Sequence, residues 1–157
     1  MSEAPELNDD FKDVLAELIE AGADFLVVGA HALAAHGIPR ATGDLDVLVR
    51  PTAENAELVW RALLRFGAPL QAHGLKPVDF AKPEVVYQMG LPPRRIDLLT
   101  SISGVSFETA WSHRVERAVA GLRLAFISRA DLLANKRAAA RPKDLLDVEL
   151  LEEADRK

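Results

Sequence analysis

The first half of the chain alternates between helical and strand-like patterns of apolar residues. In residues 11–21, apolar side chains recur three and four positions apart, as they do along one face of a helix. Residues 25–28 instead form a short uninterrupted apolar run, which is typical of a buried strand. The pattern predicts, in chain order, a helix at 11–21 capped by Asn8 or Asp9, a strand at 25–28, a helix at 30–36, a strand at 44–49 and a helix from the cap Thr52 to residue 66.

The second half is less regular, and it begins with a stretch rich in Gly and Pro at 67–83 that we expect to be mostly loop. Beyond it the pattern predicts strands at 84–89 and 94–99, a hairpin of 115–119 with 122–127, a helix from Ser128 to about 140 and a last helix at 142–153. This order favours a mixed sheet with helices on one side, in an α/β or α+β fold. We expect one domain over 1–157, with two C-terminal helices at about 128–153.

Composition narrows the class of protein. Of the 157 residues 49% are hydrophobic and 27% charged, which is typical of a globular chain rather than a disordered one. The absence of cysteine excludes disulfides, cysteine-based zinc sites and thiol catalysis. A net charge of -5 argues against nucleic-acid binding driven by charge alone. No apolar run approaches the roughly 20 residues of a membrane span, and residues 1–10 do not resemble a signal peptide, so we expect a cytoplasmic protein with no membrane partner.

Two carboxylates at the start of the second predicted strand are the sharpest chemical feature. Strand alternation places Asp44 and Asp46 on one face, with their Cα atoms about 6.7 Å apart. Like charges on a buried strand repel each other unless something compensates, and hard divalent cations take such oxygen ligands. The alternative is a solvent-exposed strand end.

A third acid lies in a similar setting. Asp97 falls within the apolar run 95–99, and three carboxylates would converge if this strand lay beside residues 44–49. Three acids at one place indicate a metal site. The alternative is that Asp97 pairs with Arg94 or Arg95.

Upstream, Gly29, Ala30 and His31 stand at a strand-to-helix junction, where backbone N–H groups suit a phosphate. Later in the chain, Lys136 shares a helix face with apolar neighbours, so it either extends its ammonium group to solvent or meets an anion. His31 and His36 do not share a face as two metal ligands would, and we interpret their side chains as packing or helix-end groups.

Together these motifs resemble a known superfamily. Residues 28–33, His36-Gly37, Arg40, Thr42 and 44–47 are similar to nucleotidyltransferases of the DNA polymerase beta type, and most of all to small bacterial AbiEii/AbiGii-toxin-like nucleotidyltransferase proteins. The C-terminal part adds Asp131, then Lys136 after four residues, then the acids Asp144 and Asp147, which resembles the same family's pattern. The resemblance covers about 25–151.

The resemblance implies a polymerase-beta-like nucleotidyltransferase fold, a mixed sheet flanked by helices, and transfer of a nucleoside monophosphate from an NTP to an RNA or protein acceptor. It implies Mg²⁺ or Mn²⁺ as cofactor in two-metal catalysis, held by Asp44, Asp46 and Asp97, with Lys136 as a further catalytic residue. The nucleotide-binding residues that it implies are Gly29, Ala30, His31, Arg40, Thr42 and Asp144.

One departure keeps a second interpretation open. Many relatives carry Gly-Ser or Gly-Gly where this chain has Gly29-Ala30, and Ala30 has no hydroxyl for the triphosphate. The alternative is a catalytically inert nucleotidyltransferase-like binding module, such as the toxin or the antitoxin of a two-protein pair.

Overall fold

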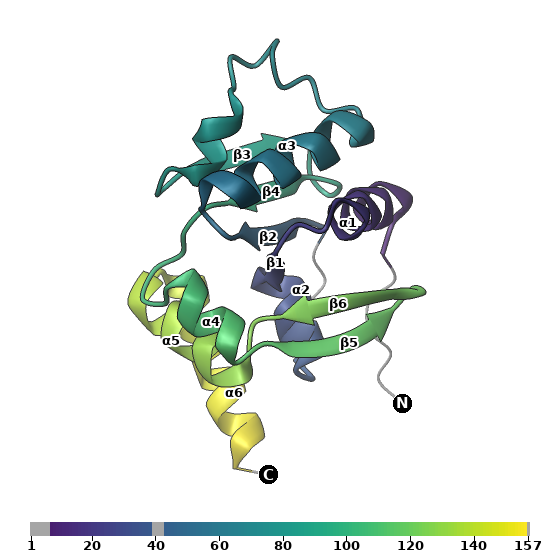
Figure 1. Ribbon diagram of the computed structural model, residues 1–157. Coiled ribbons are helices and arrows are strands. Elements are labelled where there is room, and N and C mark those ends of the chain that lie inside the picture. The colour runs from purple at the N-terminus through teal and green to yellow at the C-terminus, as the bar shows by residue number, and fades with distance from the viewer. Residues whose placement is uncertain (1–6, 39–42, 157) are drawn as a thin grey trace.

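A mixed sheet of six strands, in the order β3-β4-β2-β1-β6-β5, organises the computed structural model (Figure 1), which describes residues 7–38 and 43–156. The strands are β1 (Phe25–Val28), β2 (Leu45–Val49), β3 (Val86–Met89), β4 (Ile96–Leu99), β5 (Val115–Val119) and β6 (Leu122–Phe126). The helices are α1 (Asp9–Ala21), α2 (Gly29–Ala35), α3 (Ala53–Phe66), the 3₁₀-helix η1 (Pro77–Ala81), α4 (Phe107–Ser112), α5 (Arg129–Ala139) and α6 (Pro142–Asp155).

Parallel and antiparallel pairings alternate across the centre of this sheet. β1 runs antiparallel to β2 and parallel to β6, and β2 runs parallel to β4. The β2–β4 register sets Asp46 directly opposite Asp97. The predicted mixed α+β architecture is therefore confirmed, and the two central strands that carry acids are neighbours.

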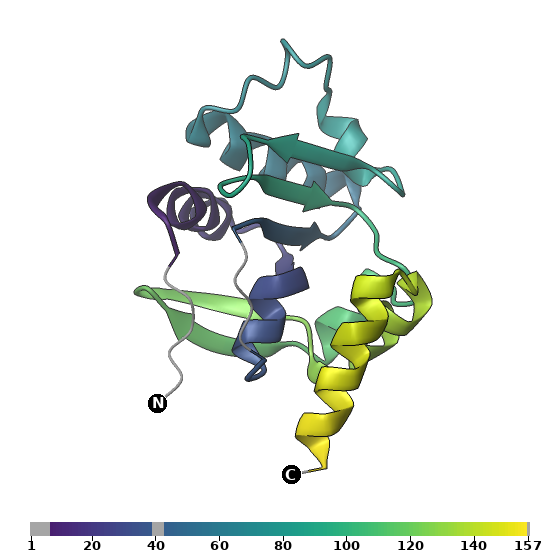
Figure 2. The same ribbon diagram turned by 180° about the vertical axis from the view of Figure 1, so that it is seen from behind.

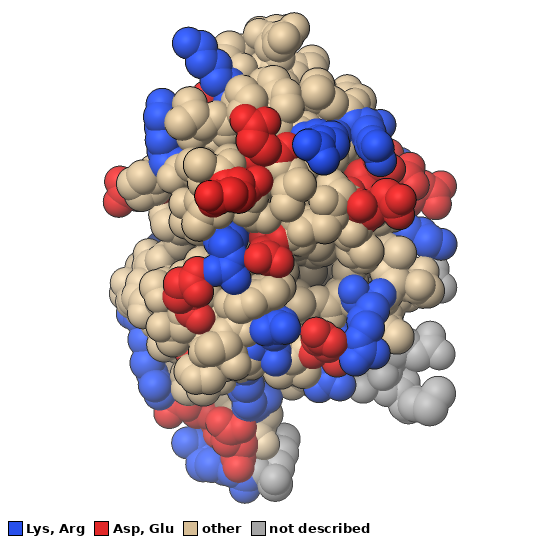
Figure 3. Space-filling model, viewed as in Figure 1, with Lys and Arg blue, Asp and Glu red and all other residues tan. Residues whose placement is uncertain are grey.

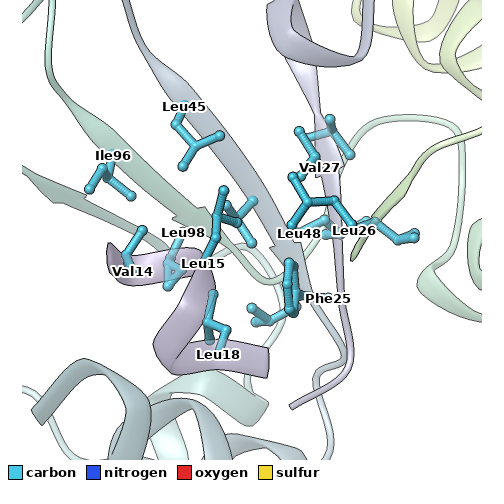
Figure 4. Close-up of a cluster of buried hydrophobic side chains, with 14 of the residues drawn as sticks. Val14, Leu15, Leu18, Phe25, Leu26, Val27, Leu45, Leu48, Ile96 and Leu98 are labelled. Atoms are coloured by element: carbon cyan, nitrogen blue, oxygen red, sulfur yellow. The ribbon is translucent and has the colours of Figure 1, made fainter. Parts of the chain in front are cut away.

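The core forms between α1 and the middle of the sheet (Figure 4). Leu15 and Leu18 of α1 and Leu48 of β2 are fully buried, and Leu98 of β4 lies in the same cluster. Burying side chains of this size contributes about 1.5–3 kcal/mol each, so this layer holds β2 and β4 rigidly in place.

The helices lie on both sides of the sheet. α3 lies in front of β3 and β4 in Figure 1 and behind them in Figure 2, whereas α2 and α6 are in front in Figure 2. The expectation of helices on one side was therefore wrong. Because α2 and α5 approach the sheet from the side opposite α3, they close a space against the acid-bearing strands.

The predicted helix caps are present. Asn8, Thr52 and Ser128 each accept a hydrogen bond at the start of their helices, from the backbone N–H groups of Phe11, Asn55 and Asp131. Sequence patterning missed α4, a helix of six residues that Ser106 caps. Its apolar side chains are too few to show a helical period, although the Ser106 cap is a recognisable signal.

The face seen in Figure 3 mixes acidic and basic side chains over α3, α4 and the β5–β6 hairpin. Within 7–38 and 43–156, no helix is long and apolar enough to cross a membrane.

Candidate active site

A cleft of about 770 Å³ lies between the acid-bearing strands and the two C-terminal helices. Its sheet wall comes from β2, β3 and β4 and the loop that follows β4, and its other wall comes from the start of α2, from α5 and from the start of α6. The cleft is lined by Val28, Gly29, Ala30, Leu33, Asp44, Asp46, Val86, Gln88, Arg95, Asp97, Leu99, Ser101, Ile102, Ser103, Asn135, Lys136, Ala139, Arg141, Lys143 and Asp147.

Three carboxylates face this cleft from one face of two adjacent strands. Asp46 of β2 is paired in register with Asp97 of β4. Asp44 lies two residues before Asp46 and therefore on the same face. The parallel β2–β4 pairing thus brings together the three acids that the sequence singled out.

The closeness of these acids perturbs Asp46. Burial, the charge of Asp97 with its hydrogen bond, and the charge of Asp44 raise the pKa of Asp46 to about 6, although the positive charge of Lys136 opposes the shift. A carboxylate that is costly to ionise next to two others is the arrangement that a bound cation relieves.

Arg95 already supplies part of the compensating positive charge. Its Nε and one terminal nitrogen donate to the two oxygens of Asp97 at 2.9 and 3.2 Å, and that nitrogen also lies 3.2 Å from Oδ2 of Asp44. The hydrogen bonds to Asp97 raise the pKa of Arg95. Convergence of the acids and pairing with Arg95, which the sequence left as alternatives, therefore occur together.

Gly29 permits the close approach of Asp46 to the start of α2. Its φ of +66° lies in the left-handed region, and a Cβ built on it would overlap the Asp46 carboxylate. Only glycine accommodates both demands without strain. The junction of β1 and α2 is therefore fitted around Asp46, with Ala30 beside it on the cleft wall.

The side chain of His31 points away from the cleft. Its ring packs edge-on against Phe11 at 5.6 Å and lines a separate small apolar cavity of about 20 Å³. Burial lowers the pKa of His31, so the ring is neutral near pH 7. His36 hydrogen-bonds the carbonyl of Ile127 through Nε2 at 2.8 Å. Both side chains serve in packing, and a nucleotide-binding role of His31 is left to its backbone amide.

Lys136 is anchored on the opposite wall by two buried acids of α6. Its Nζ lies 3.3 Å from Asp144 and 3.1 Å from Asp147, whose side chains are 1% and 2% exposed. Burial alone would raise the pKa of Asp144, but the hydrogen bond from Arg141 and the charge of Lys136 outweigh it and lower that pKa below its usual value. Lys136 is therefore fixed as a cation facing the cleft.

The structure brings both Asp144 and Asp147 against Lys136. Asp147, which is not among the implied nucleotide-binding residues, lines the cleft, whereas Asp144 pairs with Lys136 and accepts a hydrogen bond from Nε of Arg141 at 2.6 Å. A signal was present, because Asp144, Asp147, Val148 and Leu151 follow helical spacing and all are buried. Acids inside an apolar stripe require buried partners.

The predicted phosphate contacts Arg40 and Thr42 lie outside the described residues. The carboxylates Asp44, Asp46 and Asp97 fit a hard divalent cation in donor type. As the side chains stand, however, no group of three Asp, Glu or His within the described ranges is placed to hold a metal ion. Arg95 contacts two of the three acids in this arrangement.

Comparison with solved structures supports the fold. The chain is similar to the crystal structure of a putative nucleotidyltransferase from Thermotoga maritima, with a TM-score of 0.55, 12% sequence identity and 95% of each chain covered. No family model matches the chain, and a search of curated proteins found no match. At this identity the likeness shows the fold alone, a mixed sheet flanked by helices that is shared with that structure, and it does not reach the closer resemblance to AbiEii/AbiGii-type proteins.

Proposed function

We propose that this protein is a metal-dependent nucleotidyltransferase that transfers a nucleoside monophosphate from an NTP to an acceptor hydroxyl. The observation that carries the proposal is the in-register pair of Asp46 and Asp97, with Asp44 on the same face, opposite a buried Lys136. The nucleotidyltransferase-like fold of the Thermotoga maritima structure supports it.

In the proposed reaction, the acceptor oxygen attacks the α-phosphorus, the bond from that phosphorus to the β-bridging oxygen breaks, and pyrophosphate leaves. Asp44, Asp46 and Asp97 would hold Mg²⁺ or Mn²⁺, which when bound stabilises charge on the phosphoryl oxygens and lowers the pKa of an attached hydroxyl. Asp97 lies on the β4 side of the cleft and would receive the acceptor's proton.

The remaining contacts position the triphosphate. Lys136 faces the cleft as a cation and would meet the negative phosphates, and Lys143 and Arg141 line the same wall. Gly29 leaves room for the phosphates beside Asp46, where Ala30 offers its backbone N–H but no hydroxyl. These groups provide electrostatic stabilisation that is fixed before the reaction starts.

An inert binding module is the second candidate, and Ala30 is the observation that favours it. Under that proposal the fold serves in recognition, for example as the toxin or the antitoxin of a pair, and the acids are held neutralised by Arg95. This candidate predicts NTP-independent partner binding and no transfer.

Incubation with each radiolabelled NTP and Mg²⁺, with total RNA or total protein as acceptor, tests the proposal directly. We expect label transfer that requires Lys136, and Lys136→Ala should reduce its rate about a hundredfold or more, as loss of one preorganised charged donor typically does. Lys136→Arg keeps the charge if the alanine variant leaves Asp144 and Asp147 too poorly compensated to fold.

Lys82→Ala is the matched control, because Lys82 is exposed and its ion pair within the described residues is with Asp79, outside the cleft. No transfer by a folded wild-type protein with any NTP would overturn the proposal. Equal transfer by wild type and Lys136→Ala would remove Lys136 from the site.

A further inference from the structure

Arg95 lies against the acids that are proposed to hold the metal ion. Its guanidinium makes three contacts of 3.2 Å or less with two of the three acids, using both oxygens of Asp97 and one oxygen of Asp44. The Arg95–Asp97 pair is bidentate and charge-assisted, which makes its hydrogen bonds strong. The pair is partly buried, since 30% of the Arg95 side chain and 10% of the Asp97 side chain are exposed.

The contacts of Arg95 offset the mutual repulsion of the three carboxylates. Without Arg95, Asp97 and Asp44 would face Asp46 with less positive charge to offset them, since Lys136 and Arg141 act on Asp46 from the opposite wall. The positive charge of Arg95 therefore does for these carboxylates what a divalent cation would do. The Arg95 guanidinium and a divalent cation would repel each other if both contacted the same two carboxylates, and this repulsion is strong where water is partly excluded.

The Arg95 side chain also has room to move away from the carboxylates. Arg95 directly precedes β4, so its backbone is fixed by the sheet, while its long side chain lines the open cleft. Rotation of the side chain would move the guanidinium into the cleft without any change in the strand. Asp97, by contrast, is held in register opposite Asp46.

We propose that Arg95 competes with the divalent cation for Asp97 and Asp44, so that the guanidinium must leave these carboxylates when the ion binds. This inference rests on the proposed function, which supplies the ion. The opposite role is that Arg95 orients the acids for the metal. The two roles predict opposite signs for the effect of removing Arg95 on metal affinity.

Titration of the metal alone separates these roles. Binding of Mn²⁺ is measured by isothermal titration calorimetry, without nucleotide, for wild type, Arg95→Gln and Arg95→Lys. Competition predicts that Arg95→Gln binds Mn²⁺ about tenfold more tightly or better, because an opposing charge is gone. Arg95→Lys should fall between, since it keeps the charge but loses the paired contacts.

The matched control is Arg94→Gln. Arg94 is the neighbouring arginine, its side chain is 61% exposed, and it forms an ion pair with Asp10 at 4.0 Å, away from the cleft. Removing its charge changes the net charge of the chain by the same amount and should leave Mn²⁺ affinity within about twofold of wild type. Equal or weaker Mn²⁺ binding by Arg95→Gln than by wild type overturns the proposal.

A second measurement uses the wild-type chain and so does not depend on a variant that folds. In NMR spectra, the Nε–H proton of Arg95 should exchange slowly with water in the metal-free protein and faster when diamagnetic Mg²⁺ saturates the site. An unchanged exchange rate at saturation overturns the proposal. Neither measurement involves transfer, so loss of nucleotidyltransferase activity and loss of this competition are distinguishable results.

Discussion

Asn in place of Asp46 should make the metal-free protein more stable at pH 7.5. Asp46 is the acid whose ionisation costs most in this site, because it is buried and faces Asp97 and Asp44. Asn has nearly the same shape, carries no charge and has a side-chain N–H that can donate to Asp97. The substitution therefore removes a repulsion and should leave the packing of β2 unchanged.

The pKa of Asp46 gives the size of the effect. A shift from the usual 3.8 to about 6 corresponds to roughly 3 kcal/mol at about 1.4 kcal/mol per unit, which is an upper bound for the gain. Because the folded pKa is raised, the folded protein holds the proton more tightly than the unfolded chain between about pH 4 and 6. Stability therefore falls as pH rises through this window, and the full cost is present above it.

Urea unfolding in EDTA at pH 7.5 and at pH 4 is the assay. We expect Asp46→Asn to gain about 1–3 kcal/mol at pH 7.5, and nearly nothing at pH 4, where Asp46 is already protonated. In thermal melts at pH 7.5 the gain would appear as roughly 2–4 °C per kcal/mol. With Mg²⁺ added, wild type should be stabilised and the variant should not.

Asp13→Asn is the control, since Asp13 is an exposed acid of α1 and its substitution removes the same charge from the chain. Equal stability of Asp46→Asn and wild type at pH 7.5, or the same gain at both pH values, would refute the reasoning.

Two further substitutions test the walls of the cleft. Gly29→Ala should lower the free energy of unfolding by about 1–3 kcal/mol and also weaken Mn²⁺ binding, because its Cβ would displace the Asp46 carboxylate. Gly37 shares the positive φ but has open space around it, so Gly37→Ala should lower the stability without changing Mn²⁺ binding. Calorimetric Mn²⁺ titration beside urea unfolding checks both, and unchanged Mn²⁺ affinity in Gly29→Ala would contradict the contact. Asp147→Asn removes one of the two carboxylates that hold Lys136 and should weaken ATP binding about tenfold while Mn²⁺ affinity changes little. Equal loss of both affinities would instead indicate that Asp147 acts on the metal site.

The sequence by itself determined the local elements and their ends. Apolar spacing predicted α1, and the sequence predicted the cap Thr52 and offered Asn8 as one of two caps for α1, because capping depends on residues within one turn. Strand alternation likewise placed Asp44 and Asp46 on one face. The short helix α4 was not predicted, because six residues are too few to show a helical period.

Only the tertiary structure decided how these pieces meet. The parallel pairing of β2 with β4 sets Asp46 opposite Asp97 across about fifty residues of chain, and no local pattern specifies which strands become neighbours. In the same way, the pairing of Arg95 with Asp97 follows from their spacing of two residues along one strand. The contact of Arg95 with Asp44, by contrast, forms only because the two strands lie side by side. The ion pair between Asp147 and Lys136 forms because helices α5 and α6 pack together. Charge compensation in this cleft is therefore partly non-local, because local pairs such as Arg95 with Asp97 are completed by partners that folding brings from elsewhere in the chain.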